Sequence, residues 1–119
     1  MLLKVYEWER STWPEFQEVM LEPCEAEATL RKLVRHFKTR AIYMTFGNHR
    51  SGGGRYVAYW PIRMDEVRLT KRNINLGTVI HEFAHHLDTC RWRKRAGHGR
   101  TFKRELKRVY TWAKRYLPR

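Results

Sequence analysis

The chain of 119 residues has few cysteines, no long apolar run and half as many acidic as basic residues. Its two cysteines, Cys24 and Cys90, are too few for a disulfide framework or for a zinc ribbon built on four cysteines. No apolar stretch approaches the ~18 residues that a membrane span requires. Residues 1–10 interrupt their apolar positions with charges, which is not typical of a signal peptide. We therefore expect a soluble, cytoplasmic protein of a reducing compartment, neither secreted nor embedded in a membrane.

Acidic residues are scarce outside the N-terminal quarter of the chain. Residues 1–28 hold seven glutamates and two basic residues, whereas residues 89–119 hold twelve Lys and Arg and a single acid, Glu105. With a net charge of +13, this uneven distribution favours a polyanionic partner, nucleic acid above all. The sequence thus predicts non-specific DNA contacts through basic residues 91–119 and an association with DNA or the nucleoid. A well-solvated surface without such a partner is the alternative.

The length suits one domain, residues 1–119, around one modest core. The glycine-rich residues 47–55 predict a hairpin turn rather than a phosphate-binding loop, because they lack the GxxxxGK[ST] pattern. We expect an α+β fold with a small antiparallel or mixed sheet of about three strands packed with about three helices. The residue patterns predict strands at 41–46, 56–63 and 66–71, a further possible strand at 2–8, short helical or irregular structure at 13–28, and helices at 25–40, 75–92 and 101–116.

The segment His81-Glu82-Phe83-Ala84-His85 carries the residues with the clearest chemistry. On a helical wheel His85 lies ~40° from His81, while the apolar residues of the helix centre near ~220°. Both imidazoles therefore leave one face, one turn apart, as two ligands of one zinc ion at ~2.0–2.1 Å must. Glu82 lies beside that face, where its carboxylate can take a proton from a zinc-activated water. We predict a Zn²⁺ site with Glu82 as general base; two solvated helix histidines are the alternative.

A catalytic zinc site needs a third protein ligand. The extended pattern HExxHxxGxxH requires glycine and histidine where this chain has Asp88 and Arg91, which excludes a metzincin. Two candidates remain, a downstream helical glutamate, Glu105, and His98, which has a glycine on each side. Because glycines allow a tight backbone turn that would bring the imidazole back over the first helix, we favour His98.

The stretch VRLTKRNINLGTVIHEFAHHLD, followed by HGRTFK, resembles the SprT-like (Spartan-type) zinc metallopeptidases. The resemblance covers roughly residues 55–110, and the shared pattern is HExxH, an intervening stretch, and HGxx followed by an aromatic residue. It implies a minimal zincin fold in which His81, His85 and His98 hold zinc and Glu82 is the general base. It also implies proteolysis associated with DNA, such as the removal of proteins crosslinked to DNA, in agreement with the basic charge.

One departure from that family concerns the DNA contact. Many members carry a cysteine-rich zinc ribbon or another DNA-binding module after the protease domain, and these 119 residues contain none. Any DNA contact would then come from the basic surface of the domain itself. We expect a monomer whose partners are a protein or peptide substrate and DNA.

Three further residues of the same helix have predicted roles. Asp88 lies on the metal face and could orient a ligand histidine as a hydrogen-bond acceptor, with an ordinary exposed aspartate as the alternative. His86 lies at the rim of the apolar face and is predicted to pack rather than to bind metal. Cys90 is predicted to be an inert core thiol.

The function that the sequence favours is hydrolysis of peptide bonds, with the substrate chain paired along an exposed strand edge beside the helix. One alternative is a non-enzymatic, basic nucleic-acid-binding module whose zinc site is incidental or structural. Another is a zinc hydrolase that acts on a different bond through the same residues.

Overall fold

The computed structural model describes residues 2–47, 54–57, 65–70, 74–92 and 97–117. This part of the chain forms five helices and a three-stranded sheet, so the α+β prediction is confirmed, with more helix than expected. The elements are α1 (Leu2–Thr12), α2 (Pro14–Gln17), α3 (Pro23–Phe37), β1 (Ile42–Gly47), β2 (Gly54–Val57), β3 (Asp65–Thr70), α4 (Leu76–Trp92) and α5 (Arg100–Tyr116).

The helix α1 stands where the sequence predicted a possible strand, at residues 2–8. Val, Tyr and Trp favour strands, but that preference depends on packing and is readily overridden. The buried residues Val5 and Glu9 are four positions apart, which places them on one face of a helix. The acidic stretch at residues 13–28 contains the short α2 and the start of α3, each with a proline in its first turn, where the missing N–H costs nothing.

The sheet is mixed, as predicted, with the strand order β1-β3-β2. β3 pairs in parallel with β1 and antiparallel with β2. The predicted hairpin between β1 and β2 is therefore wrong, because β3 lies between these two strands. The turn itself, at residues 48–53, and the second half of the predicted strand at 56–63 lie outside the described residues.

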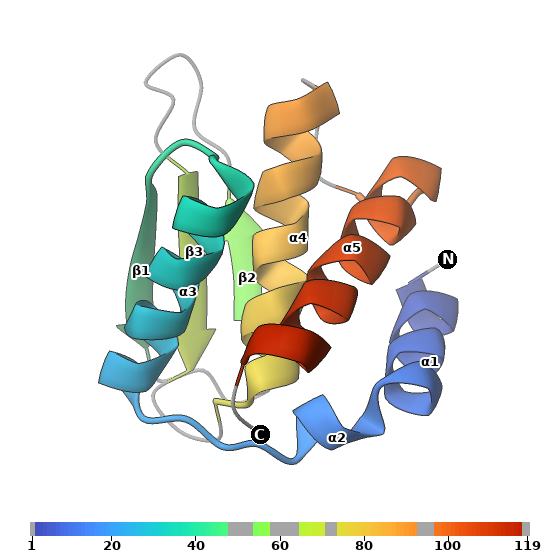
Figure 1. The fold of residues 1–119 in the computed structure, drawn as a ribbon, viewed down its shortest axis with the longest axis horizontal. Coiled ribbons are helices and arrows are strands. Elements are labelled where there is room, and N and C mark those ends of the chain that lie inside the picture. Colours follow the sequence, from blue (N-terminus) through green and yellow to red (C-terminus); the bar gives the residue numbers. More distant parts are fainter. Residues whose placement is uncertain (1, 48–53, 58–64, 71–73, 93–96, 118–119) are drawn as a thin grey trace.

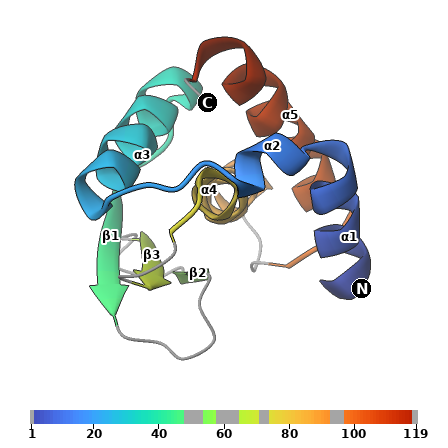
Figure 2. The same ribbon diagram turned by 90° about the horizontal axis from the view of Figure 1, so that it is seen from below.

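The helix α4 runs through the centre of the molecule. Figures 1 and 2 show α3 and the sheet on one side of it and α5 and α1 on the other. Thirteen of its 17 residues are buried, including His81, Glu82 and His85, so its polar face is covered by other helices rather than by solvent. Asn75 caps its N-terminus, since Asn75 Oδ1 accepts a hydrogen bond from Thr78 N–H at 2.8 Å.

The helices α3 and α5 confirm the predicted helical periodicity. A reciprocal pair of hydrogen bonds between Glu22 and Glu25 starts α3, and Lys38, at φ 55°, ends it. Phe102, Leu106, Val109, Tyr110 and Ala113 recur at helical spacing in α5 and are buried, whereas Tyr116 is 61% exposed. The helix α5 buries these five residues against α4.

Among the described residues, no helix combines the length and the apolar character needed to cross a membrane.

Candidate metal centre

Three histidine side chains meet where α4 and the beginning of α5 pack together. His81 and His85 come from α4, and His98 lies two residues before α5. Each offers one ring nitrogen, and these atoms all lie within 4.8 Å of one another. The Nε2 atoms of His81 and His98 are 3.2 Å apart. Two nitrogens on one tetrahedral zinc lie about 3.3 Å apart at the usual bond lengths, so this separation fits a shared ion. The three histidines therefore lie close enough to hold a metal ion.

Phe102 fixes the start of α5 against the three histidines. Its ring is fully buried and stacks on His85, with the centroids 4.1 Å apart and the planes at 21°. It presents its edge region to His81 and His98 at centroid distances of 5.1 and 5.0 Å. The aromatic residue that follows the HGxx pattern thus forms one wall of the cluster and determines where His98 lies.

The glycines beside His98 do not have the role that the sequence suggested. Neither Gly97 nor Gly99 has a positive φ, and a Cβ at either position would meet no atom within 4 Å. Gly99 is the N-cap residue of α5 with φ −78° and ψ −167°, an extended conformation that other residues adopt. His98 is placed by the packing of α5 on α4, not by glycine-specific backbone geometry.

Glu9 is a member of the site that the sequence patterns did not indicate. Its Oε1 lies 2.5 Å from Nδ1 of His81, and both side chains are 4% exposed. Because a carboxylate accepts, this contact places the ring proton on Nδ1 and leaves the lone pair of Nε2 directed toward His98. The other carboxylate oxygen of Glu9 accepts a hydrogen bond from the hydroxyl of Tyr110 at 2.6 Å. Glu9 therefore joins α1 to His81 on α4 and to Tyr110 on the buried side of α5.

Tyr6 is the second residue that α1 adds to the site. Its ring stacks on His81, with the centroids 5.1 Å apart and the planes at 16°. Burial and the negative charges of Glu82 and Glu9 raise the pKa of Tyr6, so its hydroxyl keeps its proton. Tyr6 and Glu9 are three positions apart, a spacing that joins side chains on a helix and separates them on a strand. If residues 2–12 had been predicted as a helix, this spacing would have placed Tyr6 and Glu9 together on one face.

The electrostatic environment differs between His81 and His98. Burial lowers the pKa of His81, but the hydrogen bond to Glu9 and the charges of Glu9 and Glu82 outweigh it and raise the pKa overall. The pKa of His98 is lowered, first by burial and then by the charge of His81. Of these two histidines, His81 therefore holds a proton more firmly than His98, and a metal ion that binds there must displace it.

Glu82 lies beside the cluster, as the helical wheel predicted. It is 4% exposed, and its charge acts on both His81 and Tyr6. Asp88 is fully buried, which excludes the exposed alternative, although the described acceptor of the Nδ1 proton of His81 is Glu9. The proposed orienting role of Asp88 stays a prediction.

The remaining candidates on α4 and α5 lie away from the three histidines. His86 is buried and packs as predicted, with its Nε2 2.9 Å from the backbone oxygen of Arg40. Cys90 is half-buried rather than fully buried and contacts His86. The alternative ligand, Glu105, is fully buried and accepts hydrogen bonds of 2.8 and 3.1 Å from Arg108. Its carboxylate thus belongs to an ion pair instead of the cluster.

Comparison of the chain with models of protein families, with curated proteins and with solved structures gave no match. The assignment of a function therefore rests on the geometry of the site and on the sequence pattern.

The ligand set predicts different metal contents for two variants. Replacing His98 by alanine removes one of three nitrogen ligands, so we expect the purified protein to lose its stoichiometric metal. Glu105→Gln changes a buried carboxylate of the same helix without touching the cluster, and we expect it to retain the metal. Inductively coupled plasma mass spectrometry of the two variants and the wild type measures this. Loss of metal in Glu105→Gln but not in His98→Ala would assign the third ligand to Glu105.

Proposed function

We propose that the chain is a zinc-dependent metallopeptidase of the SprT-like type, with a zincin-like fold in which His81, His85 and His98 hold the metal. The observation that carries the proposal is the group of three histidine nitrogens within 4.8 Å of one another. Three histidines leave a fourth position for water or substrate, which is the usual arrangement of a catalytic zinc site. The carboxylate next in sequence to His81, Glu82, supplies the base that hydrolysis needs.

The residues around the three histidines have different proposed roles in hydrolysis. Zn²⁺, when bound, supplies a Lewis acid that polarises the scissile carbonyl and lowers the pKa of a water toward about 7. Glu82 takes a proton from the attacking water and passes it to the leaving amine. Glu9 holds the ring of His81 in the orientation that directs Nε2 toward the metal. Phe102 and Tyr6 flank the imidazoles and shield them from bulk solvent.

The substrate chain is proposed to bind along β2. This strand is an edge of the described sheet and packs against α4, which carries the metal ligands (Figure 1). An extended peptide can add to such an edge through backbone hydrogen bonds, which select the substrate only weakly by its side chains. An enzyme with weak sequence selectivity suits substrates that are chosen by where they are bound. The net charge of +13 favours DNA-associated or DNA-crosslinked proteins as these substrates. A non-enzymatic nucleic-acid-binding module is the second candidate, favoured by the basic face of α5 described below.

The proposal is tested by hydrolysis of an unfolded protein such as casein. We expect activity in the zinc-loaded chain, loss of activity with 1,10-phenanthroline and recovery when zinc is restored, because the reaction needs the metal. Single-stranded DNA should raise the rate at low salt and not at high salt, since phosphate contacts weaken as salt increases. A wild-type protein that binds no zinc when zinc is offered, or that hydrolyses equally well without it, would contradict the proposal.

A further inference from the structure

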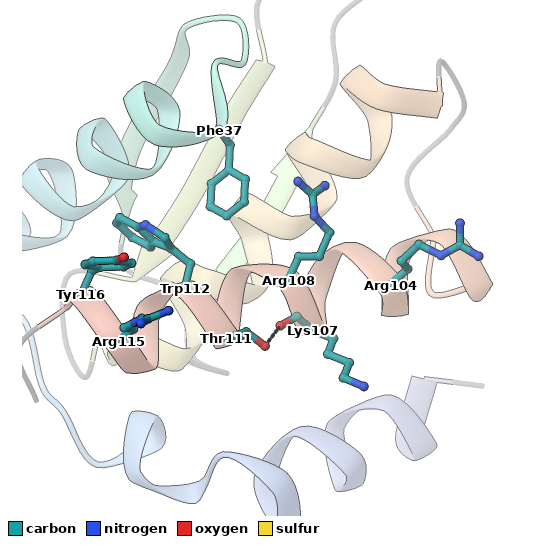
Figure 3. A pocket seen from close by; sticks show the side chains of 8 residues that line it. All are labelled: Phe37, Arg104, Lys107, Arg108, Thr111, Trp112, Arg115 and Tyr116. Atoms are coloured by element: carbon teal, nitrogen blue, oxygen red, sulfur yellow. Dashed lines mark hydrogen bonds between the residues drawn. The ribbon is translucent and has the colours of Figure 1, made fainter.

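A groove whose surface is mainly apolar, with four basic residues among those that line it, lies along α5 on the side that faces α3 (Figure 3). It has a volume of about 440 Å³, within the range of ~300–1,000 Å³ typical of ligand sites. Among the described residues, no acidic side chain lines it. Four of the residues that line the groove are basic: Arg104, Lys107, Arg108 and Arg115. The others are Thr111 and three aromatic residues, Phe37, Trp112 and Tyr116. We call this site the α5 groove.

The basic residues share one face of α5 because of their spacing. Arg104, Arg108 and Arg115 form, with Thr111, one stripe of positions three or four apart along the helix, and Lys107 adjoins it, three positions after Arg104 and four before Thr111. The opposite face is the one that α5 buries against α4. All four basic residues are exposed, but Arg108 is also held by the carboxylate of Glu105 at 2.8 Å. Arg104 and Arg115 lie over the rings of Trp92 and Tyr116, contacts that leave the cationic charge in place. Arg104, Lys107 and Arg115 are thus available for an anionic ligand.

Three aromatic rings, from Phe37, Trp112 and Tyr116, accompany this stripe (Figure 3). Trp112 is half-buried and held in place by stacking on His36, with the centroids 4.7 Å apart and the planes at 24°. Phe37 meets it edge-on at 6.0 Å. Tyr116 lies 5.7 Å from Trp112 and is 61% exposed. The aromatic cluster therefore ends in one exposed ring, Tyr116, and the guanidinium of Arg115 lies 5.9 Å from the centroid of that ring.

We propose that the α5 groove binds single-stranded nucleic acid. Arg104, Lys107 and Arg115 contact the phosphates, and an unpaired base stacks on Tyr116 beside Trp112. Proteins that bind single strands combine positive charges along the sugar-phosphate backbone with aromatic rings on which bases stack. The α5 groove has both. The bases of a duplex are stacked on one another, so a duplex would use the cations and leave the rings without a partner.

Two other anionic partners fit the groove less well. A membrane surface would need the apolar face of α5, but that face is buried in the core, where Leu106, Val109 and Ala113 are each 0% exposed. The carboxylates of an acidic peptide would neutralise the arginines, but Asp and Glu side chains offer no ring to stack on Tyr116. Charge and aromatic surface together therefore favour a nucleic acid with exposed bases.

The groove is separate from the three histidines. Phe102, which contacts the histidines, and Trp112 are ten residues apart, about 15 Å along the helix. Phe102 belongs to the buried face of α5, whereas Tyr116 and the cations do not. The binding proposed here goes beyond the peptidase activity and does not depend on it, so it is measured by binding alone.

The aromatic part of the proposal is tested with a fluorescein-labelled dT₁₅ oligonucleotide and the full zinc-loaded chain. We expect anisotropy titrations to show that Tyr116→Ala weakens binding by roughly 5- to 150-fold, the usual loss for one base-stacking ring. Tyr116→Phe keeps the ring and should bind as the wild type does. Because Tyr116 is exposed, neither change should disturb folding. Far-ultraviolet circular dichroism of both variants would check this.

The charged part is tested with a pair of double variants that lower the net charge equally. Arg104→Ala/Arg115→Ala removes two groove cations, whereas Lys32→Ala/Lys103→Ala removes two exposed cations that do not line it. The first pair should reduce the slope of log K against log salt by about 1.4, which is two phosphate contacts on a single strand. The second pair should change the slope little.

Three results would overturn the assignment. The first is a control pair that weakens binding as much as the groove pair, because charge alone would then explain it. The second is a duplex of equal length that binds as tightly as dT₁₅. The third is polyglutamate, or vesicles with phosphatidylserine, that binds while dT₁₅ does not. Loss of peptidase activity in Glu82→Gln with unchanged dT₁₅ binding would leave the groove assignment standing.

Discussion

Replacing Glu82 by glutamine is expected to lower the rate of peptide hydrolysis by about 10²–10⁴-fold, the usual contribution of a general base. Glutamine has nearly the same shape as glutamate but cannot accept the proton of the attacking water. The three histidines are unchanged, so the variant should keep its zinc. The measurement combines kcat for casein or a fluorogenic peptide with the zinc content of the same sample.

The matched control for this variant is Glu105→Gln, which makes the same chemical change at another buried carboxylate. It should retain hydrolysis, because Glu105 bonds Arg108 and lies outside the cluster. Two outcomes would contradict the role given to Glu82. Activity that survives in Glu82→Gln would show that another group removes the proton. Loss of zinc from Glu82→Gln would show that the carboxylate contributes to metal binding.

Replacing Glu9 by alanine is expected to weaken zinc binding by about 10–100-fold, as removal of the carboxylate behind a ligand histidine usually does. Without Glu9, His81 loses the acceptor of its Nδ1 proton, so the ring is free to rotate or to protonate at Nε2 instead. Glu9→Gln offers an amide oxygen to the same proton without the negative charge, and its zinc affinity should fall between those of the alanine variant and the wild type. Competition with a chromophoric chelator at fixed pH measures the Kd for zinc.

The control for Glu9 is Tyr110→Phe, which removes the other hydrogen bond of the same carboxylate. It leaves Oε2 of Glu9 buried without the donor at 2.6 Å, so the free energy of unfolding should fall by about 1–3 kcal/mol. The zinc Kd should stay close to that of the wild type, because the contact with His81 is unchanged. If Tyr110→Phe weakens zinc binding as strongly as Glu9→Ala, Glu9 acts by holding α1 in place and not by orienting His81.

Local patterns predicted those parts of the site that lie on one element. His81 and His85 are one turn apart on α4, and a helix brings residues at that spacing to one face wherever it packs. The same periodicity predicted α3, α4 and α5, and the stretches of strand-forming residues predicted β1 and β3. The glycines beside His98 favour it over Glu105, and the resemblance to SprT-like peptidases implies the same residue. The structure brings His98 to the other two histidines through the packing of Phe102.

Contacts between distant segments could not be predicted in the same way. Glu9 meets His81 across 72 positions and Tyr110 across 101, and no motif distinguishes it from the other six glutamates of residues 1–28. The strand-forming residues of α1 obscured the helical spacing of Tyr6 and Glu9. The order β1-β3-β2 depends on which strands pair, and glycine-rich sequence between two strands does not decide that.

The sequence by itself determined the chemistry available to this protein: two histidines and a carboxylate at helical spacing, a third histidine downstream, and a basic C-terminal segment. Covalent connectivity and helical geometry are enough for that. Only the tertiary structure decided how this chemistry is assembled. It covered the polar face of α4 with α1 and α5, placed Glu9 behind His81, and left Tyr116 exposed beside a stripe of cations. These outcomes depend on which surfaces bury one another, because burial gives a carboxylate or an aromatic ring its partner.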